Sequence, residues 1–206
     1  MNKEQRYQTI LLFGAPGAGK GTQGKILGSI PGFFHLSCGD VFRTFDVASE
    51  LGKIVYEYSS RGELVPDEIT IKIWREKIHD HTVLNLYKRL SDLLVLDGIP
   101  RSANQAELMD EHIDVLRVIH LVCDNQDEMI KRLRRRALKE NRVDDAREDV
   151  IRRRWEVYKQ ETQPVLDHYP QSIISTVDAI GSPAEVLQNI LKIVIPVQNA
   201  HFAHAV

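Results

Sequence analysis

Five short runs of aliphatic and β-branched residues recur along the 206-residue chain, at residues 9–13, 33–36, 93–96, 117–122 and 172–177. Longer stretches with helical periodicity separate these runs, and strands that alternate with helices predict βαβ units and a parallel sheet. Each run is almost continuously apolar, which is typical of a strand that helices cover on both faces. No repeat or linker divides the chain. The sequence therefore predicts one α/β domain around a parallel sheet.

Capping sequences mark the starts of two predicted helices. Residues 182–185, with the sequence SPAE, supply an N-cap serine, a proline at the first helical position and the glutamate of a capping box. We expect this C-terminal helix to end near Val194 and residues 196–206 to be loosely held. Residues 145–148, with the sequence DARE, predict in the same way an N-cap at Asp145 for the helix that carries residues 152–158.

A glycine-rich segment, GAPGAGKGTQ, follows the first apolar run at residues 14–23. Such a loop between a strand and a helix directs several backbone N–H groups and the positive end of the helix at one small volume, which suits a polyphosphate. Lys20 can reach the terminal phosphates as a mobile charge. The common phosphate loop has a serine or threonine after its lysine, whereas Gly21 stands there in this chain and Thr22 is the nearest hydroxyl. The competing interpretation is a glycine-rich turn with an exposed lysine.

A second candidate site follows a later apolar run, in LLVLDGIPR at residues 93–101. Asp97 ends this run, and ligands of open α/β sheets bind at the carboxyl ends of the strands. A carboxylate there can orient water on a magnesium ion that is bound to phosphate. Arg101 follows on a tight turn beside the same crevice. Taken alone, Asp97 could equally form a turn and Arg101 could be a surface charge.

Composition excludes several classes of function. The chain has a net charge of -2 and a pI near 6.4, without the basic balance of nucleic-acid-binding proteins. Its two cysteines, Cys38 and Cys123, are too few for a disulfide framework or a four-cysteine zinc site, so we expect no structural zinc. No apolar run approaches the roughly 18 residues of a membrane span, and the first residues lack the apolar core of a signal peptide. We expect a cytoplasmic protein that binds neither membrane nor nucleic acid.

Five segments of the chain, from about residue 9 to residue 191, resemble the adenylate kinase family in order and spacing. They are GAPGAGKGTQ (14–23), HLSCGDVFR (35–43), GELVPDE (62–68), LDGIPR (96–101) and NRVDD (141–145). The resemblance implies a P-loop NTPase fold with a five-stranded parallel sheet, and transfer of the terminal phosphoryl group of ATP to AMP, giving two ADP. In that family a glycine follows the loop lysine, so Gly21 conforms to the family pattern.

The resemblance also implies one kinase domain over residues 1–206 with two mobile excursions. An NMP-binding excursion at 37–65 would close over AMP, and a short lid at 136–146 would close over ATP. The core would then comprise residues 1–36, 66–135 and 147–195. Such a lid carries no zinc, and monomers are usual in the family.

Site residues follow from the resemblance, position by position. Those expected to contact ATP are Gly17, Ala18, Gly19, Lys20, Gly21, Thr22, Arg132, Arg136 and Gly181, with Arg132 stacked on the adenine. Those expected to contact AMP are Cys38, Arg43, Glu63, Leu64, Val65, Gly98, Ile99, Pro100, Arg101, Gln105, Arg142 and Arg153. The expected catalytic residues are Lys20, Asp97, Arg101, Arg136, Arg142 and Arg153. Asp97, through water, and Thr22 are the candidates to hold Mg²⁺.

Nine arginines lie between Met129 and Tyr158. The family alignment assigns Arg142 and Arg153 to the transferring phosphoryl group, which the closing lid brings within their reach. Asp144 and Asp145 are expected to position the site arginines. We assign the remaining five to a solvated face with acidic partners: Arg134, Arg135, Arg147, Arg152 and Arg154.

Two positions bear on the choice of AMP as substrate. Gln105 can receive the edge of adenine, but Ser102-x-x-Gln105 is also a capping box. Cys38 stands where adenylate kinases have threonine and UMP/CMP kinases have alanine, whereas the latter usually have asparagine at the position of Gln105. Ile99 replaces a phenylalanine, which we interpret as a packing change. We favour AMP; UMP/CMP kinase, or a nucleotide-binding regulatory protein without turnover, are the alternatives.

Overall fold

A five-stranded sheet forms the centre of the computed structural model, which describes residues 6–140, 142 and 145–204. The strand order is β2-β3-β1-β4-β5, and every neighbouring pair is parallel. A strand forms in each of the five predicted runs, although the fourth begins at Ile113, earlier than expected, and the fifth begins at Ile174, after a 3₁₀ turn at Gln171–Ile173. The strands are β1 (Tyr7–Gly14), β2 (Phe33–Ser37), β3 (Leu93–Asp97), β4 (Ile113–Val122) and β5 (Ile174–Asp178).

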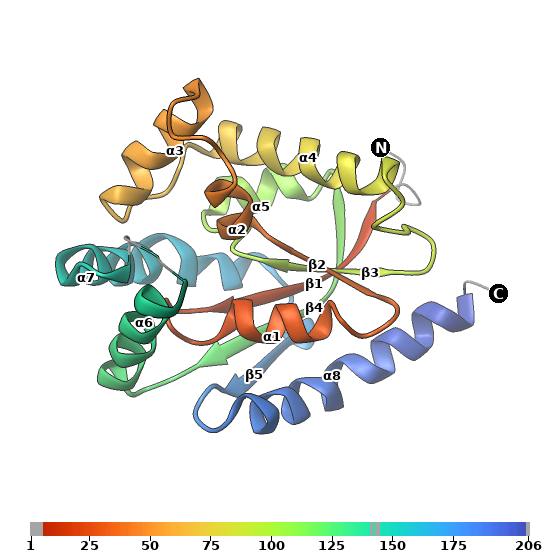
Figure 1. The fold of residues 1–206 in the computed structure, drawn as a ribbon. Coiled ribbons are helices and arrows are strands. Elements are labelled where there is room, and N and C mark those ends of the chain that lie inside the picture. Colours follow the sequence, from red (N-terminus) through yellow and green to blue (C-terminus); the bar gives the residue numbers. More distant parts are fainter. Residues whose placement is uncertain (1–5, 141, 143–144, 205–206) are drawn as a thin grey trace.

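Helices cover both faces of the sheet, as the continuous apolar runs predicted (Figure 1). Side chains of β3 alternate between two hydrophobic clusters: Leu94 and Leu96 pack with Trp74 of one helical layer, and Val95 packs with Leu27 of the other. The helices are α1 (Lys20–Leu27), α2 (Cys38–Arg43), α3 (Glu50–Ser60), α4 (Asp67–Val83), α5 (Ala103–Met109), α6 (Gln126–Glu140), α7 (Glu148–Val157) and α8 (Pro183–His204).

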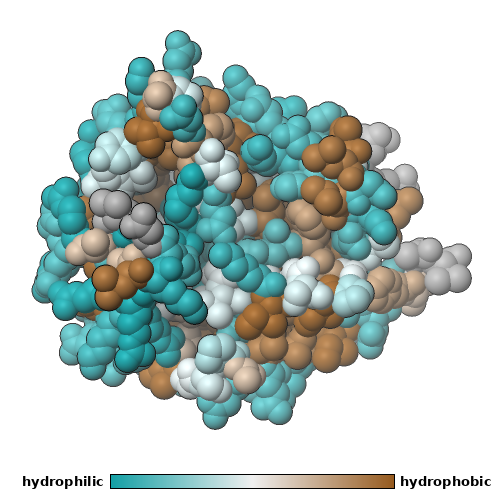
Figure 2. All heavy atoms as spheres, in the orientation of Figure 1, coloured by the Kyte–Doolittle hydropathy of each residue, from teal (hydrophilic) through white to brown (hydrophobic). Residues whose placement is uncertain are grey.

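Parallel pairing brings the carboxyl ends of the strands to one edge of the sheet. Asp97, the last residue of β3, pairs in register with Leu12 of β1 and Ser37 of β2. This edge faces left in Figure 1, where α2, α3, α6 and α7 surround it. Hydrophilic residues cover most of α6 and α7 in the same view (Figure 2). The loops after β1 and β3, which carry the two candidate motifs, therefore meet at one place.

The chain does not leave the helical conformation at the end of α7. It continues as a π-helical turn, Tyr158–Thr162, and then as a 3₁₀ turn, Gln163–His168. The Thr162 hydroxyl donates a hydrogen bond of 2.8 Å to the backbone oxygen of Arg101. This turn consequently connects α7 to the loop that follows β3.

The capping box predicted for α8 is confirmed. The Ser182 hydroxyl accepts a hydrogen bond from the Glu185 N–H (3.3 Å), and the Glu185 carboxylate accepts one from the Ser182 N–H (2.7 Å). The helix, however, extends to His204 rather than ending near Val194.

The expectation of a loosely held tail is wrong for residues 196–204. Gln198 Nε2 donates a hydrogen bond of 2.9 Å to the oxygen of Pro31. His201, which is buried, has its Nδ1 2.6 Å from Oε1 of Gln8 at the start of the sheet. Contacts with segments far away in the sequence thus hold the last turns of α8.

Candidate active site

The glycine-rich loop connects β1 to the N-terminus of α1. Gly19 is the N-cap of α1 with φ 92°, and it has no side chain to cap the first-turn N–H groups. Gly17 has φ 90°, and a Cβ there would lie 2.8 Å from the backbone oxygen of Met129, so a side chain is excluded on both counts. The uncapped amides at the positive end of the helix form a site suited to phosphate.

Lys20 lies back across the loop. Its Nζ donates to the oxygens of Gly14 (2.5 Å) and Ala15 (3.2 Å). Burial, together with the charges of three nearby arginines, lowers the pKa of Lys20 to about 8, and Asp97 opposes this shift. An incoming phosphate would stabilise the ammonium that burial disfavours.

Asp97 is 7% exposed and lies directly beside α1. A Cβ on Gly21 would be 3.4 Å from Asp97 Oδ2, so the missing side chain leaves the carboxylate uncovered on this side. Gly21 is helical, and its backbone conformation does not require glycine. A carboxylate oxygen is the donor that Mg²⁺ prefers. Thr22, the other candidate, is exposed on α1.

Among the described residues, no group of three or more His, Cys, Asp or Glu is arranged to hold a metal ion on protein ligands alone. An ion brought in with ATP fits this arrangement, because nucleotide phosphates and water then complete the ligands that one carboxylate begins.

Arg43 and Arg101 converge over the start of α2. A Cβ on Gly39 would lie 3.3 Å from Arg43 Nη2 and 3.8 Å from Arg101 Nη2. Both arginines line a cavity of about 390 Å³, as does Lys20. The structure therefore brings the two expected AMP-phosphate residues together and opens them onto the same space as the phosphate loop.

Arg142 reaches this space from the segment before α7. It is 11% exposed, and its Nη2 lies 3.2 Å from Asp40 Oδ1 on α2. Asp40 also pairs with Arg43 (2.5 Å) and Lys25 (3.3 Å). Partial burial disfavours the charged carboxylate of Asp40, but Arg43 and Lys25 hold its pKa below the usual value. In this structure the Asp40 carboxylate thus pairs with two arginines whose guanidinium groups are suited to bind phosphate.

Asp145 is not a helix cap; α7 begins at Glu148 with Arg147 as its N-cap. The Asp145 side chain is fully buried, and its two oxygens lie 2.6 Å from Arg136 Nε and 2.5 Å from Arg154 Nη1. The expected positioning of Arg136 by Asp145 is confirmed. Asp144 lies outside the described residues.

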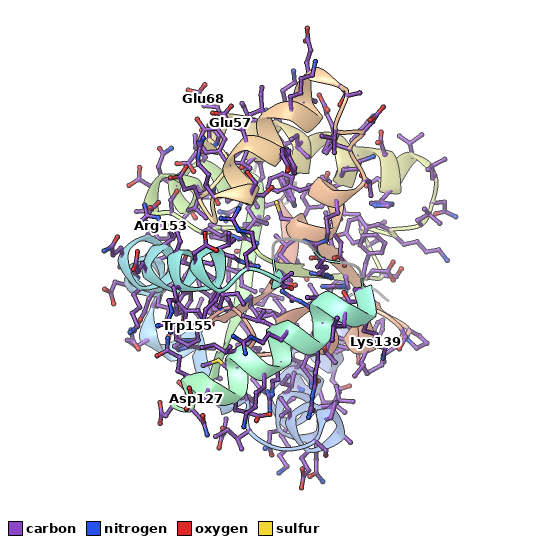
Figure 3. All side chains as sticks on the ribbon, turned by 60° about the vertical axis from the view of Figure 1, so that its left-hand side comes forward. Glu57, Glu68, Asp127, Lys139, Arg153 and Trp155 are labelled. Carbon is purple, nitrogen blue, oxygen red and sulfur yellow. The ribbon has the colours of Figure 1, made fainter. Side chains whose placement is uncertain are left out.

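The structure differs from our expectation for two consecutive arginines of α7. Arg153 is 46% exposed, pairs with Glu156, and lies on the opposite side of the helix from Trp155 (Figure 3). It is not among the described residues that line the cavity, whereas Arg154, 22% exposed, is. The solvated face that we assigned to Arg154 is therefore wrong. Arg147, also assigned to that face, is exposed and paired with Asp149 as expected, although it lines the cavity as well.

A signal for Arg154 was present in the sequence. Ile151, Trp155 and Tyr158 are buried, and Arg154 completes their i, i+3, i+4, i+7 pattern. The helical phase therefore placed Arg154 on the inward side, whereas the family alignment without this phase selected Arg153.

Gln105 forms only half of the expected capping box in this structure, because its side chain accepts from the Arg101 N–H rather than from that of the N-cap residue Ser102. Gln105 is 1% exposed, and its backbone N–H donates to the Ser102 hydroxyl (3.0 Å). Its amide oxygen accepts from the Arg101 N–H (2.7 Å), and its Nε2 donates to Asp67 Oδ1 (2.7 Å). Both ends of the side chain are engaged, so a contact with adenine requires these bonds to exchange.

The remaining expected AMP residues divide into two groups. Glu63, Leu64, Gly98 and Pro100 line the cavity. Cys38, Val65 and Ile99 are buried, and Ile99 packs in the core as expected. Burial raises the pKa of Cys38 to about 11, against the opposing charge of Arg101, so its thiol is unreactive near neutral pH.

The residues expected at the ATP purine also lie close to one another. Arg132 Nη1 donates a hydrogen bond of 2.8 Å to the oxygen of Ala179, two residues before Gly181. Its Nε contacts Glu128 at 3.3 Å, which fixes the guanidinium beside this loop.

Backbone amides, one lysine and several arginines thus direct positive charge at a cleft above the carboxyl edge of a parallel sheet, an arrangement that defines a P-loop nucleotide-binding protein. The model of the adenylate kinase family matches residues 12–174. The chain is 39% identical over 186 residues to the adenylate kinase of Thermobifida fusca, covering 87% of this chain and 94% of that protein. It is 36% identical over 190 residues to the Thermus thermophilus enzyme, with 89% and 95% covered. The chain therefore belongs to the adenylate kinase family, and the reaction that follows is the conversion of ATP and AMP to two ADP.

Proposed function

We propose that ATP with Mg²⁺ and AMP bind together in the cleft, and that its residues divide the reaction between them. The observation that carries this proposal is that two separate phosphate-binding groups open on one cavity: Lys20 with its loop, and Arg43 with Arg101. The first suits the terminal phosphates of ATP, because uncapped amides and a mobile ammonium meet there. The second suits a monophosphate, because arginine forks bind its oxygens bidentately.

The transferring phosphoryl group would lie between these two groups. Phosphoryl transfer needs little covalent help, so alignment and neutralisation of oxygen charge carry the acceleration and no general base is required. Arg142 and Arg154 line the same cavity and supply that charge, with Arg136 held beside Arg154 by Asp145. Arg154 thus takes the role that we expected of Arg153. Mg²⁺ on ATP neutralises phosphate charge further, and Asp97 would hold it through water.

Exclusion of water is the second task of the cleft. Arg142 already contacts α2 through Asp40, so the segment before α7 and the NMP-binding excursion meet over the cavity. Their closure would protect ATP from hydrolysis until AMP is present. The excursions at 37–65 and 136–146 are the segments that we propose to move.

One coupled assay tests this function. ATP·Mg is supplied with AMP, UMP, CMP or dCMP in turn, and formation of nucleoside diphosphate is followed. We expect AMP to react fastest and to give two ADP per ATP consumed. Faster turnover of UMP or CMP would support the UMP/CMP kinase alternative that Cys38 raises. If no acceptor reacts, the proposed activity is wrong, and the result supports the alternative of a nucleotide-binding protein without turnover.

Partners and location are proposals of the same kind. The expected partners are ATP, AMP and ADP, bound by a cytoplasmic monomer. Within the described part of the chain, no helix combines the length and apolarity that crossing a bilayer demands. Size-exclusion chromatography with light scattering should give the 23.6 kDa of one chain, and a mass near twice that value would contradict the monomer.

A further inference from the structure

A pair of residues outside the proposed catalytic set ties α7 to the sheet. His120, on β4, has its Nε2 3.1 Å from the hydroxyl of Tyr158, the first residue of the π-helical turn after α7. His120 pairs in register with Phe13 of β1 and Thr176 of β5, so it lies inside the sheet rather than at its border. The next residue of β1 is Gly14, whose oxygen accepts from Lys20. The hydrogen bond between His120 and Tyr158 thus lies beside the start of the phosphate loop.

Tyr158 and Arg154 lie one helical turn apart. The Tyr158 N–H donates to the Arg154 oxygen, and both residues line the cavity. Tyr158 is 9% exposed, so its ring has little freedom once its hydroxyl is bonded. The contact between the Tyr158 hydroxyl and β4 therefore determines the position of the Arg154 backbone.

The far end of the same turn is tied as well. Thr162 bonds the backbone oxygen of Arg101, at 2.8 Å. A π-helical turn is rare, and such turns occur frequently at functional sites. Here it connects two arginines of the cleft, because its first residue follows Arg154 by one turn and its last holds the backbone of Arg101.

The chemistry of the pair gives a neutral hydrogen bond. Burial, together with the charge of Lys20, lowers the pKa of His120, so its imidazole is uncharged at neutral pH. Burial raises the pKa of Tyr158 to about 12, so its hydroxyl keeps its proton. A neutral hydrogen bond adds no charge to the cleft, so the electrostatic field there comes from the arginines and Lys20.

We propose that His120 and Tyr158 are positioning residues for phosphoryl transfer: their hydrogen bond holds the end of α7 against β4 so that Arg154 stands in the cleft. Asp145 holds the guanidinium of Arg154, and the pair holds its backbone. This inference rests on the proposed role of Arg154. It adds two residues, one on β4 and one on the π-helical turn, whose proposed role is to position Arg154.

The test uses substitutions that remove single groups from the whole enzyme. Tyr158→Phe removes the hydroxyl alone, and His120→Leu removes the other partner. The matched control is Tyr169→Phe, because Tyr169 is also buried and its hydroxyl has no hydrogen-bond partner among the described residues. We expect Tyr158→Phe and His120→Leu to lower kcat about tenfold with KM for ATP and AMP within about twofold. Tyr169→Phe should keep kcat, and His120→Gln, which can restore a bond to the hydroxyl, should recover most of it.

A double-mutant cycle separates positioning from general loss of stability. In the Arg154→Ala background, Tyr158→Phe should cause no further loss of kcat, because the group it positions is gone. An undiminished tenfold loss in that background, or an equal loss in Tyr169→Phe, would overturn the inference. If Arg154→Ala is impaired but Tyr158→Phe is fully active, this inference alone fails. If Arg154→Ala keeps full kcat, the proposed role of Arg154 fails and the inference fails with it.

Discussion

At the scale of single residues, the ionisation of Lys20 is a property that the cleft changes strongly. Its pKa of about 8 results mainly from burial, with neighbouring arginines contributing, and negative phosphate oxygens in the cleft would oppose this shift by favouring the charged ammonium. A lysine with a lowered pKa is mostly neutral at pH 9 and becomes charged again beside a polyphosphate. Binding of ATP and protonation of Lys20 are therefore coupled.

This coupling predicts proton uptake when ATP binds. At pH 9 uptake should approach one proton per ATP, because the free enzyme lacks most of the proton that the complex holds. Calorimetric titrations in two buffers of different ionisation enthalpy measure the number. Lys20→Met should bind ATP more weakly and without this uptake. Binding enthalpies that are equal in the two buffers for the unsubstituted enzyme would contradict the coupling.

Residue 154 carries the second prediction at this scale. Arg154→Ala should lower kcat by about 100-fold or more, the usual cost of removing a donor that stabilises transition-state charge. ATP affinity should change by less than about fivefold, because the charge develops in transfer rather than in binding. Arg153→Ala is the matched control, one residue away and exposed, and should stay within about twofold. The reverse pattern would restore the original assignment to Arg153.

At the scale of elements, α8 shows how distant contacts lengthen a helix. Its start is determined by local sequence, through the capping box of Ser182 and Glu185. Its last turns contact β1 through His201 and Gln8, and the loop before β2 through Gln198 and Pro31. These contacts supply the stability that the weak helical pattern of the segment does not supply alone.

Removing one of these contacts should destabilise the fold. His201→Ala loses a hydrogen bond, worth about 1 kcal/mol, and buried ring surface worth about as much again, so we expect a loss of about 2 kcal/mol in the free energy of unfolding. Lys192→Ala, on an exposed part of the same helix, should change it by less than about 0.5 kcal/mol. Urea unfolding measures both. Equal effects would mean that the end of α8 is loosely held after all.

At the scale of the whole molecule, the distribution of charge matters more than its sum. The net charge is -2, yet the cleft gathers Lys20, Arg43, Arg101, Arg142 and Arg154 around one cavity. Asp40 and Asp145 hold some of these cations in place. Anionic nucleotides consequently meet a locally positive entrance on an acidic protein.

This field predicts a dependence on ionic strength. Because the Debye length falls from about 10 Å at 0.1 M salt to about 3 Å at 1 M, kcat/KM for AMP should fall severalfold over that range. The loss should appear mainly in KM. Arg152→Ala, which removes an exposed arginine outside the cavity, should give the same salt dependence as the unsubstituted enzyme. A KM that does not change with salt would contradict a role for the cleft field.

Features that are encoded within a few neighbouring residues could be predicted from the amino-acid sequence alone. Five apolar runs gave five strands, the SPAE segment gave the start of α8, and the glycine-rich loop indicated the phosphate site. Lys20 was identified from this loop, Arg43 and Arg101 were assigned from the resemblance to the family, and the structure brings all three to one cavity. Local signals suffice here because turn geometry, capping and helix phase depend on the chain within about one turn.

The partners of several polar side chains could not be predicted, because they lie far away in the sequence. Gln105 bonds Asp67 across 38 residues, His120 meets Tyr158 across the same separation, and His201 reaches Gln8 across 193. Asp145, expected as a helix cap, is buried between Arg136 and Arg154. The physical reason is that a buried polar group must be satisfied by whatever the fold places beside it, and packing rather than sequence neighbourhood determines that partner.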